Sequence, residues 1–335
     1  DGTVQSSSSG EKTIYNIDHT PLRVPTDVER IAAVYGPSYE AMVVLGQEEQ
    51  VIVCSDVQKD NFPWALKLFP HLSEIPCLEN VHSSVNTEEL MLYEPDLVLA
   101  FSRPNELKQL ESLNISAVPG RTTIFLSEIP EMLHVYAHAT GHGANERADL
   151  YETYFNTKLS YILERTKDLP ENERPSVYYA GIDLLTTYGS FSDIPEVIEA
   201  AGGNCVTKEI KAGNHTQISF EQLAAWNPDY IFIDHGSIGD YESVEDIKRN
   251  VLSGSRYKEI NAVKNDHIIL SPSGVFYWDM GLQKILLVMY MAKILHPDLF
   301  SDLDMNAELI EFYDTFYGCS LTGEEAEKIL NREDP

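Results

Sequence analysis

Hydrophobic and polar residues alternate along the chain in blocks that predict strands and helices in turn. Short apolar runs bounded by polar or turn residues predict buried strands, and apolar positions recurring every three or four residues predict helices. We predict strands at 30–35, 50–55, 97–101, 115–118, 176–180, 230–234 and 267–270, and helices at 36–45, 86–93, 107–113, 194–201, 220–226 and 281–296. Because strands alternate with helices, the expected fold class is α/β with mostly parallel sheets.

The longest helical pattern lies at 145–168 and ends before Pro170. A helix of about 24 residues is roughly 36 Å long, which is enough to connect two lobes. We therefore expect a tether and N-terminal extension at 1–26, an N-terminal lobe at 27–143, a linker helix at 144–170 and a C-terminal lobe at 171–335. A helical connection is stiff, so the free and bound forms are expected to superpose closely.

One stretch of the pattern occurs twice, at 81–100 and at 214–233, and the two copies align without a gap. The matched pairs, each 133 positions apart, include His82 with His215, Glu88 with Glu221, Leu90 with Leu223 and Pro95 with Pro228. This distance is too long for a solenoid repeat, whose period is a few tens of residues. The repeat indicates two similar lobes and directs attention to the space between them.

The composition of the chain excludes some classes of binding partner. At 335 residues the chain is longer than one comfortable core, and 43% hydrophobic residues is ordinary for a globular protein. The net charge of −29 argues against nucleic acid and anionic membranes, because both are bound by basic surfaces. No apolar run reaches the roughly 20 residues of a membrane span.

The cysteines and the N-terminus give less information about function. Cys54, Cys77, Cys205 and Cys319 form no C-x-x-C pair, which favours free thiols over zinc, although a Cys54–Cys77 bridge stays open. The first residues are serine-rich and polar, as in a flexible tether. The chain does not begin with methionine, so an upstream signal segment or a cloning remnant is expected.

Both copies of the repeat contain the pattern E-x-L-x(4)-P-D followed by a hydrophobic strand. The two stretches are Glu88-Glu-Leu-Met-Leu-Tyr-Glu-Pro-Asp96 and Glu221-Gln-Leu-Ala-Ala-Trp-Asn-Pro-Asp229. Further stretches of this kind are Gly36-Pro-Ser-Tyr-Glu40, Ala200-Ala-Gly-Gly-Asn204 and Ile294-Leu-His-Pro-Asp-Leu-Phe300. Over roughly 27–330, the chain resembles the class III substrate-binding proteins of ABC importers, which take up ferric siderophores, haem, vitamin B12 and related metal complexes.

The resemblance implies two α/β lobes joined by one long helix, no catalysis, and an extracytoplasmic location as a periplasmic protein or a cell-surface lipoprotein. It implies a monomer that binds a metal chelate without a covalent cofactor and docks on an ABC permease dimer. In the family, an exposed glutamate on each lobe docks into an arginine pocket of one permease subunit. Glu88 and Glu221 match these positions, although Glu89 is an alternative contact, and a helix-start carboxylate also simply favours the helix dipole.

His82 and His215 precede those glutamates by six residues in each lobe, in loops that enter helices. In the vitamin B12 member of the family, the equivalent positions hold aromatic residues that contact the corrin. An imidazole there is either a ligand-binding group, for a metal or an anionic chelate, or an ordinary surface residue. If a bare ion is bound, His235 is expected to join these two histidines.

Residues at the carboxyl ends of the strands are the other ligand candidates, because ligands of open α/β sheets bind there. Arg103 and Arg121 suit a carboxylate, phosphate or oxyanion, or else form surface ion pairs. Aromatic residues nearby are candidates for flat contact walls, or else for core. The candidate ligand-binding residues are Tyr39, Trp64, His82, Arg103, Arg121, Tyr188, His215, His235, Tyr277 and Trp278.

Two further readings remain open. One is a surface protein that binds a free metal ion or a small oxyanion such as molybdate, and the other is a chelatase-like enzyme on a related fold. The sequence has no G-x-S-x-G, Walker A or G-x-G-x-x-G motif, which disfavours the enzyme. His134, His138 and His142 follow helical spacing, and without an acidic or cysteine partner in view they are expected to form a solvated helix face.

Overall fold

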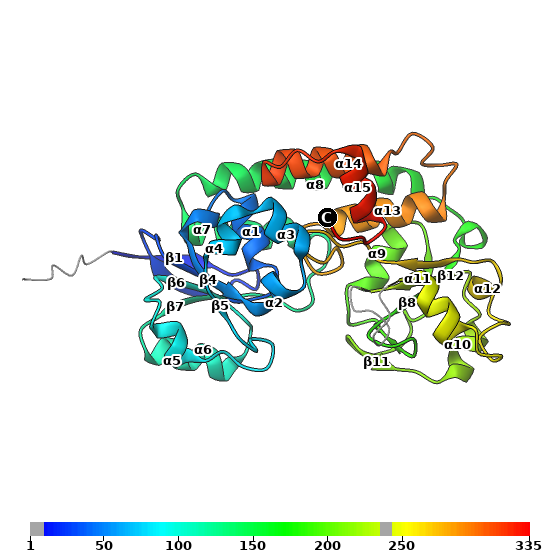
Figure 1. Ribbon diagram of the computed structural model, residues 1–335, viewed down its shortest axis with the longest axis horizontal. Helices are drawn as coiled ribbons and strands as arrows, with labels where there is room; N and C mark the ends of the chain where they lie inside the picture. The colour runs from blue at the N-terminus through cyan, green and yellow to red at the C-terminus, as the bar shows by residue number, and fades with distance from the viewer. Residues whose placement is uncertain (1–9, 235–242) are drawn as a thin grey trace, which may run out of the picture. The chain divides into compact units, whose positions relative to one another are not determined.

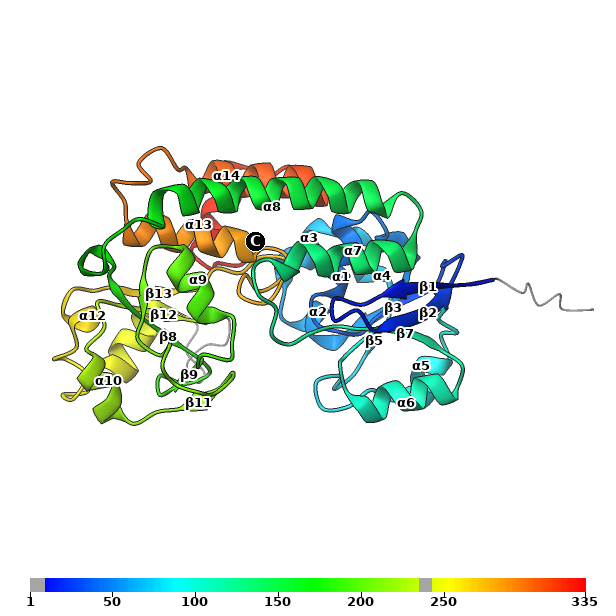
Figure 2. The same cartoon turned by 180° about the vertical axis from the view of Figure 1, so that it is seen from behind.

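The computed structural model describes residues 10–234 and 243–335. The chain forms two compact units, one of residues 1–122 and 127–153 and the other of residues 123–126 and 154–335. Each unit is built around a sheet with helices packed on it (Figures 1 and 2). The expected two-lobe α/β class is confirmed.

The first unit has a five-stranded sheet of order β5-β4-β3-β6-β7, in which every pairing is parallel. Its strands are β3 (Ile31–Ala33), β4 (Val51–Ser55), β5 (Cys77–Leu78), β6 (Leu97–Ala100) and β7 (Ser116–Pro119). The residues of the central strands β3 and β6 are all buried and those of β7 at the edge are mostly half-buried. Helices cover both faces of the sheet, with α5 and α6 on one face and α1 and α7 on the other (Figures 1 and 2).

The helices of the first unit follow the strands along the chain. They are α1 (Ser38–Val44), η1 (Glu48–Gln50), α2 (Asp56–Asp60), α3 (Pro63–Leu68), α4 (Pro70–Glu74), α5 (Thr87–Met91), α6 (Pro104–Ser112) and α7 (Glu128–Thr140). Leu90 of α5 and Leu110 of α6 are buried with strand residues such as Val98 in one hydrophobic cluster. Burying an aliphatic side chain of this kind contributes about 1.5–3 kcal/mol, so this cluster fixes the two helices on the sheet.

The expected tether and N-terminal extension at 1–26 includes an ordered hairpin. Residues Glu11–Tyr15 (β1) and Pro21–Pro25 (β2) form an antiparallel hairpin that contacts β7 and α7. Val24 is fully buried and Ile14 nearly so, which anchors the hairpin to the unit. Residues 1–9 lie outside the described part of the chain.

The second unit has a sheet of order β11-β9-β8-β12-β13, with β10 also paired to β8. Its strands are β8 (Ser176–Ala180), β9 (Thr186–Thr187), β10 (Asn204–Cys205), β11 (Thr216–Gln217), β12 (Tyr230–Ile233) and β13 (Ile268–Leu270). The pairings of β8 with β10, of β8 with β12 and of β12 with β13 are parallel, and the two pairings of the short strand β9 are antiparallel. The sheet is therefore mostly parallel, as expected.

Helices of the second unit include several that the sequence pattern did not predict, above all at the C-terminus. They are η2 (Glu171–Glu173), α9 (Ile194–Ala200), α10 (Phe220–Trp226), α11 (Val244–Ile247), η3 (Lys248–Leu252), α12 (Asn261–Lys264), α13 (Lys284–Leu295), α14 (Met305–Phe312), η4 (Tyr313–Tyr317) and α15 (Gly323–Leu330). Helix α13 is buried over most of its length. Helix α15 begins with a capping box between Thr322 and Glu325.

Helix α8 (Ala144–Thr166) continues from the first unit into the second, because the units divide between Thr153 and Tyr154. It has 23 residues, and the candidate linker at 144–170 covers it. Among the described residues, no helix meets the length and apolarity that crossing a membrane requires.

The sequence repeat corresponds to one corner built in the same way in each unit. Asp96 accepts hydrogen bonds from the backbone N–H groups of Glu29 and Arg30, which lead into β3. Asp229 likewise accepts from the backbone N–H and the hydroxyl of Ser176, the first residue of β8. Each aspartate thus joins the end of a helix, the following strand and the start of the neighbouring strand.

The turn before each corner is also shared. Glu94 and Asn227 precede the prolines, and both adopt a left-handed backbone with φ of 48° and 45°. A left-handed residue ends a helix sharply, since it turns the chain away from the helix axis. The chain therefore leaves α5 and α10 by similar turns.

Candidate functional site

Glu88 and Glu221 occupy the same place in their two units. Each is exposed and lies in the first turn of a short helix, α5 or α10. The two helices are capped alike: the side chain of Asn86 accepts from the N–H of Glu89 at 3.2 Å, and that of Ser219 accepts from the N–H of Gln222 at 3.1 Å. Each unit thus presents one carboxylate on a fixed helix start.

His82 belongs to a cluster at the carboxyl end of β6. The imidazole is exposed, and its ring centroid lies 5.6 Å from that of Phe101 in an edge-on contact. The guanidinium of Arg103 lies 4.1 Å from the centroid of the same Phe101 ring and donates to the backbone carbonyl of His82 at 2.5 Å. The structure therefore brings two predicted site residues together around one aromatic ring.

Arg103 is held on its other side by an ion pair of 2.8 Å with Glu106. A guanidinium carries five N–H donors, so the contacts with Glu106 and His82 leave others for a ligand. Its side chain keeps 27% of its surface exposed. The pairing positions the guanidinium and at the same time offsets its charge.

Arg121 lies at the carboxyl end of β7 and forms an ion pair of 3.0 Å with Glu128. Its backbone carbonyl accepts from the hydroxyl of Tyr35, whose ring contacts Phe101 edge-on at 5.4 Å. Gly120 allows this arrangement, because a Cβ there would lie only 2.2 Å from the Tyr35 ring. Tyr35 therefore connects Arg121 to the cluster around Phe101.

In the second unit, His215 is exposed on a left-handed turn with φ of 56° and contacts the ring of Tyr188 at 5.6 Å. The Tyr188 hydroxyl donates to the Asp234 carboxylate at 2.5 Å. Asp234 follows β12, at the position 133 residues after Phe101. Each unit therefore holds its repeat histidine against an aromatic ring beside a strand end, although the ring comes from a different part of the chain.

Tyr188, which contacts His215, belongs to a buried polar network. Asp234 and Asp279 are almost fully buried, and Tyr179 donates to Asp279 at 3.1 Å. Burial raises the pKa of Tyr188 far above its usual value, and the Asp234 carboxylate adds to this shift. The Tyr188 phenol therefore stays protonated and donates to Asp234, which leaves the ring as a fixed surface under His215.

Four of the five predicted aromatic contacts need correction, because the structure buries them. One is Tyr188, which is only 6% exposed beneath His215, and the other three are Tyr39, Trp64 and Trp278. The side chain of Tyr39 lies in the core of the first unit, where burial raises its pKa, and Trp64 is almost fully covered beside Lys67. Trp278 is fully buried, and its indole N–H donates to Gln283 at 3.1 Å. These three rings serve the core and offer no wall to a ligand.

Gln283 explains why Trp278 is buried. Its amide also donates to the carbonyl of Phe276 and accepts from the hydroxyl of Tyr313, at 3.1 and 3.0 Å. This network closes the loop before α13 on itself and leaves Tyr277 half-buried at its rim. Tyr277 remains a candidate contact, while His235 lies outside the described residues.

The expectation for the other histidines is also corrected. His134 forms contacts with Glu152 at 2.8 Å and with Asp149 at 3.8 Å, and His142 pairs with Asp27 at 3.1 Å. The acidic partners come from α8 and from the segment before β3, which the helical spacing of the histidines cannot reveal. These side chains are therefore not a simple solvated face.

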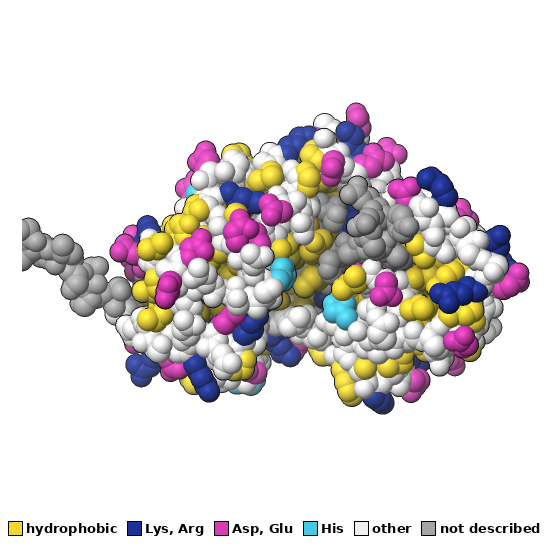
Figure 3. Space-filling view, turned by 60° about the horizontal axis from the view of Figure 1, so that its bottom comes forward, with side chains coloured by type: hydrophobic (Ala, Val, Ile, Leu, Met, Phe, Trp, Pro, Cys, Tyr) yellow, Lys and Arg dark blue, Asp and Glu magenta, His cyan; other side chains and the backbone are white. Residues whose placement is uncertain are grey.

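The strand ends carry an exposed imidazole in each unit and, in the first unit, the half-buried guanidinium groups of Arg103 and Arg121. Guanidinium and imidazole N–H groups donate hydrogen bonds to anions, and a neutral imidazole can also ligate a metal. Among the described residues, neither His82 nor His215 belongs to a group of three metal-ligating side chains. The face shown in Figure 3 has acidic and basic side chains interspersed, with no continuous basic stripe among the residues described there. Sequence reasoning missed Glu106 and Glu128 as partners of the two arginines and Asp234 as the partner of Tyr188. Only Asp234 directly follows a strand, whereas Glu106 and Glu128 lie on the helices α6 and α7.

A family model described as "Periplasmic binding protein" matches residues 31–274. The petrobactin-binding protein YclQ of Bacillus subtilis is 32% identical over 295 residues, which cover 84% of this chain and 88% of that protein. The molybdate-binding protein MolA of Haemophilus influenzae is 24% identical over 324 residues, 89% of each chain. These relatives are binding proteins rather than enzymes.

A solved periplasmic solute binding protein from Veillonella parvula has a similar structure, with a TM-score of 0.80 and 25% identity over 96% of this chain and 97% of that one. The family match, the YclQ relative and this fold agree with the repeated corner in each unit. The chain therefore belongs to the periplasmic binding protein family, in the class III group of substrate-binding proteins of ABC transporters.

Proposed function

We propose that this protein captures an anionic metal complex, such as a ferric siderophore, and delivers it to an ABC permease. Proteins of this family act outside the cytoplasm and hand their ligands to such a permease. In our proposal the chain acts as a monomer, periplasmic or lipid-anchored, and Glu88 and Glu221 each dock on one subunit of a permease dimer. The proposed ligand contacts are His82, Arg103, Arg121, His215 and Tyr277.

The observation that carries the proposal is the placement of the repeat histidines. His82 and His215 are both exposed at strand ends, each against a fixed aromatic ring. The first is accompanied by Arg103 and the nearby Arg121, whose guanidinium groups suit carboxylate, catecholate or oxyanion oxygens. Hydrogen-bond donors of this kind favour a ligand rich in negatively charged oxygen.

Burial of the tryptophans bears on the alternatives. Porphyrin and corrin rings are large and apolar, and sites for such ligands are lined mainly by aromatic and aliphatic side chains. Trp64 and Trp278 do not provide such walls, since both are in the core. We therefore favour a chelate with anionic oxygens over haem or vitamin B12.

A small oxyanion is the second candidate. The two arginines on the first unit supply donors for it, and MolA is a molybdate-binding protein by name. A bare metal ion is less supported, because each unit exposes one repeat histidine and, among the described residues, no group of three ligands around it.

Titration calorimetry with ferric petrobactin, molybdate, cyanocobalamin and haemin tests the proposal. We expect ferric petrobactin to bind most tightly, and His82→Ala and His215→Ala each to weaken binding at least about tenfold, or about 1.4 kcal/mol. His142→Ala is the control, because this histidine pairs with Asp27 away from the strand ends. Tighter binding of molybdate would replace the first candidate by the second, and preferred binding of haemin or cyanocobalamin would contradict both.

A further inference from the structure

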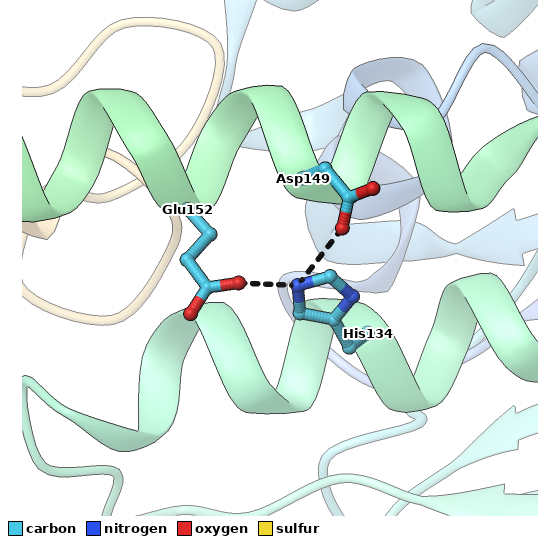
Figure 4. Close-up of side chains that lie close together, drawn as sticks. All are labelled: His134, Asp149 and Glu152. Carbon is cyan, nitrogen blue, oxygen red and sulfur yellow. Dashed lines mark hydrogen bonds and ion pairs between the residues drawn. The ribbon is translucent and has the colours of Figure 1, made fainter.

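Two carboxylates of α8 converge on one imidazole of α7 in the first unit (Figure 4). The Nε2 atom of His134 lies 2.8 Å from Oε2 of Glu152 and 3.8 Å from Oδ1 of Asp149. Asp149 and Glu152 are three positions apart in the helix, so both side chains emerge on the same face. One ligand atom from each residue lies within 4.8 Å of the others.

An ion pair accounts for only part of this arrangement. Nε2 can carry one proton, and that proton donates a good hydrogen bond to the nearer carboxylate alone. The second carboxylate is then left beside the first, where like charges repel. A cation among the three atoms would bind both carboxylates and the imidazole nitrogen together.

The surroundings leave room for such an ion. The side chain of His134 is 21% exposed, whereas those of Glu152 and Asp149 are 47% and 73% exposed, so the imidazole is mostly covered and the two acidic side chains are open to water. His134 also lines a pocket of about 520 Å³ between β1 with its following turn and helix α7, although neither carboxylate lines that pocket. Water molecules can therefore complete the coordination of an ion held by three protein ligands.

We propose that His134, Asp149 and Glu152 form a site for a divalent transition-metal ion that joins α7 to the start of α8. One imidazole with two carboxylates suits zinc and nickel better than calcium or magnesium, which prefer oxygen ligands alone. Typical bonds of about 2.0–2.2 Å to nitrogen and oxygen place neighbouring ligand atoms about 3.3 Å apart, so small side-chain rotations close the site. The net charge of −29 also raises the local concentration of divalent cations.

This site is separate from the proposed ligand contacts. His134, Asp149 and Glu152 come from helices α7 and α8, while His82 and Arg103 lie at the carboxyl end of β6. Either proposal can therefore fail without the other.

Equilibrium dialysis of the full chain against Zn²⁺ or Ni²⁺, followed by elemental analysis, tests the site. We expect about one equivalent bound to the unaltered protein, and affinity at least about tenfold lower in Asp149→Asn/Glu152→Gln, which keeps the shape of both side chains and removes their charge. His142→Ala is the matched control, because His142 has one carboxylate partner, Asp27, instead of two. His82→Ala/His215→Ala is the second control, and both controls are expected to keep the ion.

Three results would overturn the proposal. They are no bound ion in the unaltered protein, binding that persists in Asp149→Asn/Glu152→Gln, and loss of the ion in His82→Ala/His215→Ala. Displacement of Zn²⁺ by millimolar Ca²⁺ would overturn the assignment to a transition metal. A thermal melt checks that each variant is folded, and added Zn²⁺ should raise the melting temperature of the unaltered protein but not of the charge-free variant.

Discussion

Cys54 lies in β4 with its side chain fully buried, directly across from Cys77 of β5. All four cysteines are free thiols, in line with the absence of a C-x-x-C pair. Burial raises the pKa of Cys54 from 9.0 to about 12, with smaller effects from the neighbouring charges. The folded protein therefore keeps this thiol neutral at a pH where the unfolded chain has already lost the proton.

Stability should consequently fall as pH rises through 9 towards 12. In that range the unfolded state binds fewer protons than the folded state, and this difference favours unfolding. At pH 10 the loss due to Cys54 is about 1.4 kcal/mol relative to pH 7. Urea unfolding at pH 7 and at pH 10 measures this loss of stability.

Cys54→Ala provides the comparison for this prediction. The variant loses some core packing at every pH, but it should show a smaller drop between pH 7 and pH 10. Buried tyrosines other than Tyr39 contribute equally to both proteins, so the difference reports the thiol together with its effect on the pKa of Tyr39. Equal drops in the two proteins would argue against a raised pKa at Cys54.

At the level of elements, the two proline-aspartate corners each use one aspartate side chain to connect neighbouring strands. Replacing Asp96 or Asp229 by Ala leaves backbone N–H groups at the start of β3 or β8 without their acceptor. We expect each change to lower the free energy of unfolding by about 1–3 kcal/mol. Chemical denaturation of each variant and of the unaltered protein measures this change in the free energy of unfolding.

Asp298→Ala is the control for the corners, because Asp298 is exposed in the turn after α13. It should change stability by less than about 0.5 kcal/mol. A corner variant as stable as this control would mean that water replaces the aspartate without loss.

Elements with local signals could be predicted from the sequence. Helix α10 has the predicted bounds of 220–226, because Ser219 caps it and Asn227 ends it in a left-handed turn. Hairpin β1–β2 was missed because, although its strands pair across a short turn, its burial depends on contacts with β7 and α7. Contacts with elements that lie so far along the chain leave little trace in the sequence around a strand.

The candidate site likewise has features that could be predicted from the sequence and features that could not. The exposure of His82 and His215 fits their place in loops before helices, but the rings that support them come from Phe101 and Tyr188, whose role depends on the folded sheet. Trp278 was expected at the ligand because it precedes a helix. Its burial depends on Gln283 and on Tyr313, which lies 30 residues beyond Gln283.

At the scale of the whole molecule, our proposal is that delivery to a permease depends on one carboxylate from each unit. Glu88→Ala/Glu221→Ala should leave ligand affinity unchanged, because both side chains lie in helix starts rather than at strand ends. Uptake into proteoliposomes that contain the cognate permease should fall at least about tenfold at low salt, since charge guides such docking.

Glu111→Ala/Glu209→Ala is a control with the same change in charge and one exposed glutamate from each unit. Normal uptake with this control and loss with the docking variant would support a specific contact. Equal losses in both would indicate that only net charge matters, and loss in neither would contradict the docking role.

The division of the chain between its two units has a consequence for synthesis on the ribosome. The strands of the first sheet all precede residue 120, and its remaining helical residues end at Thr153. Domains generally fold as units as they emerge, the N-terminal one first. The first unit can thus bury its core, with the Asp96 corner closed, while most of the second unit is still being translated.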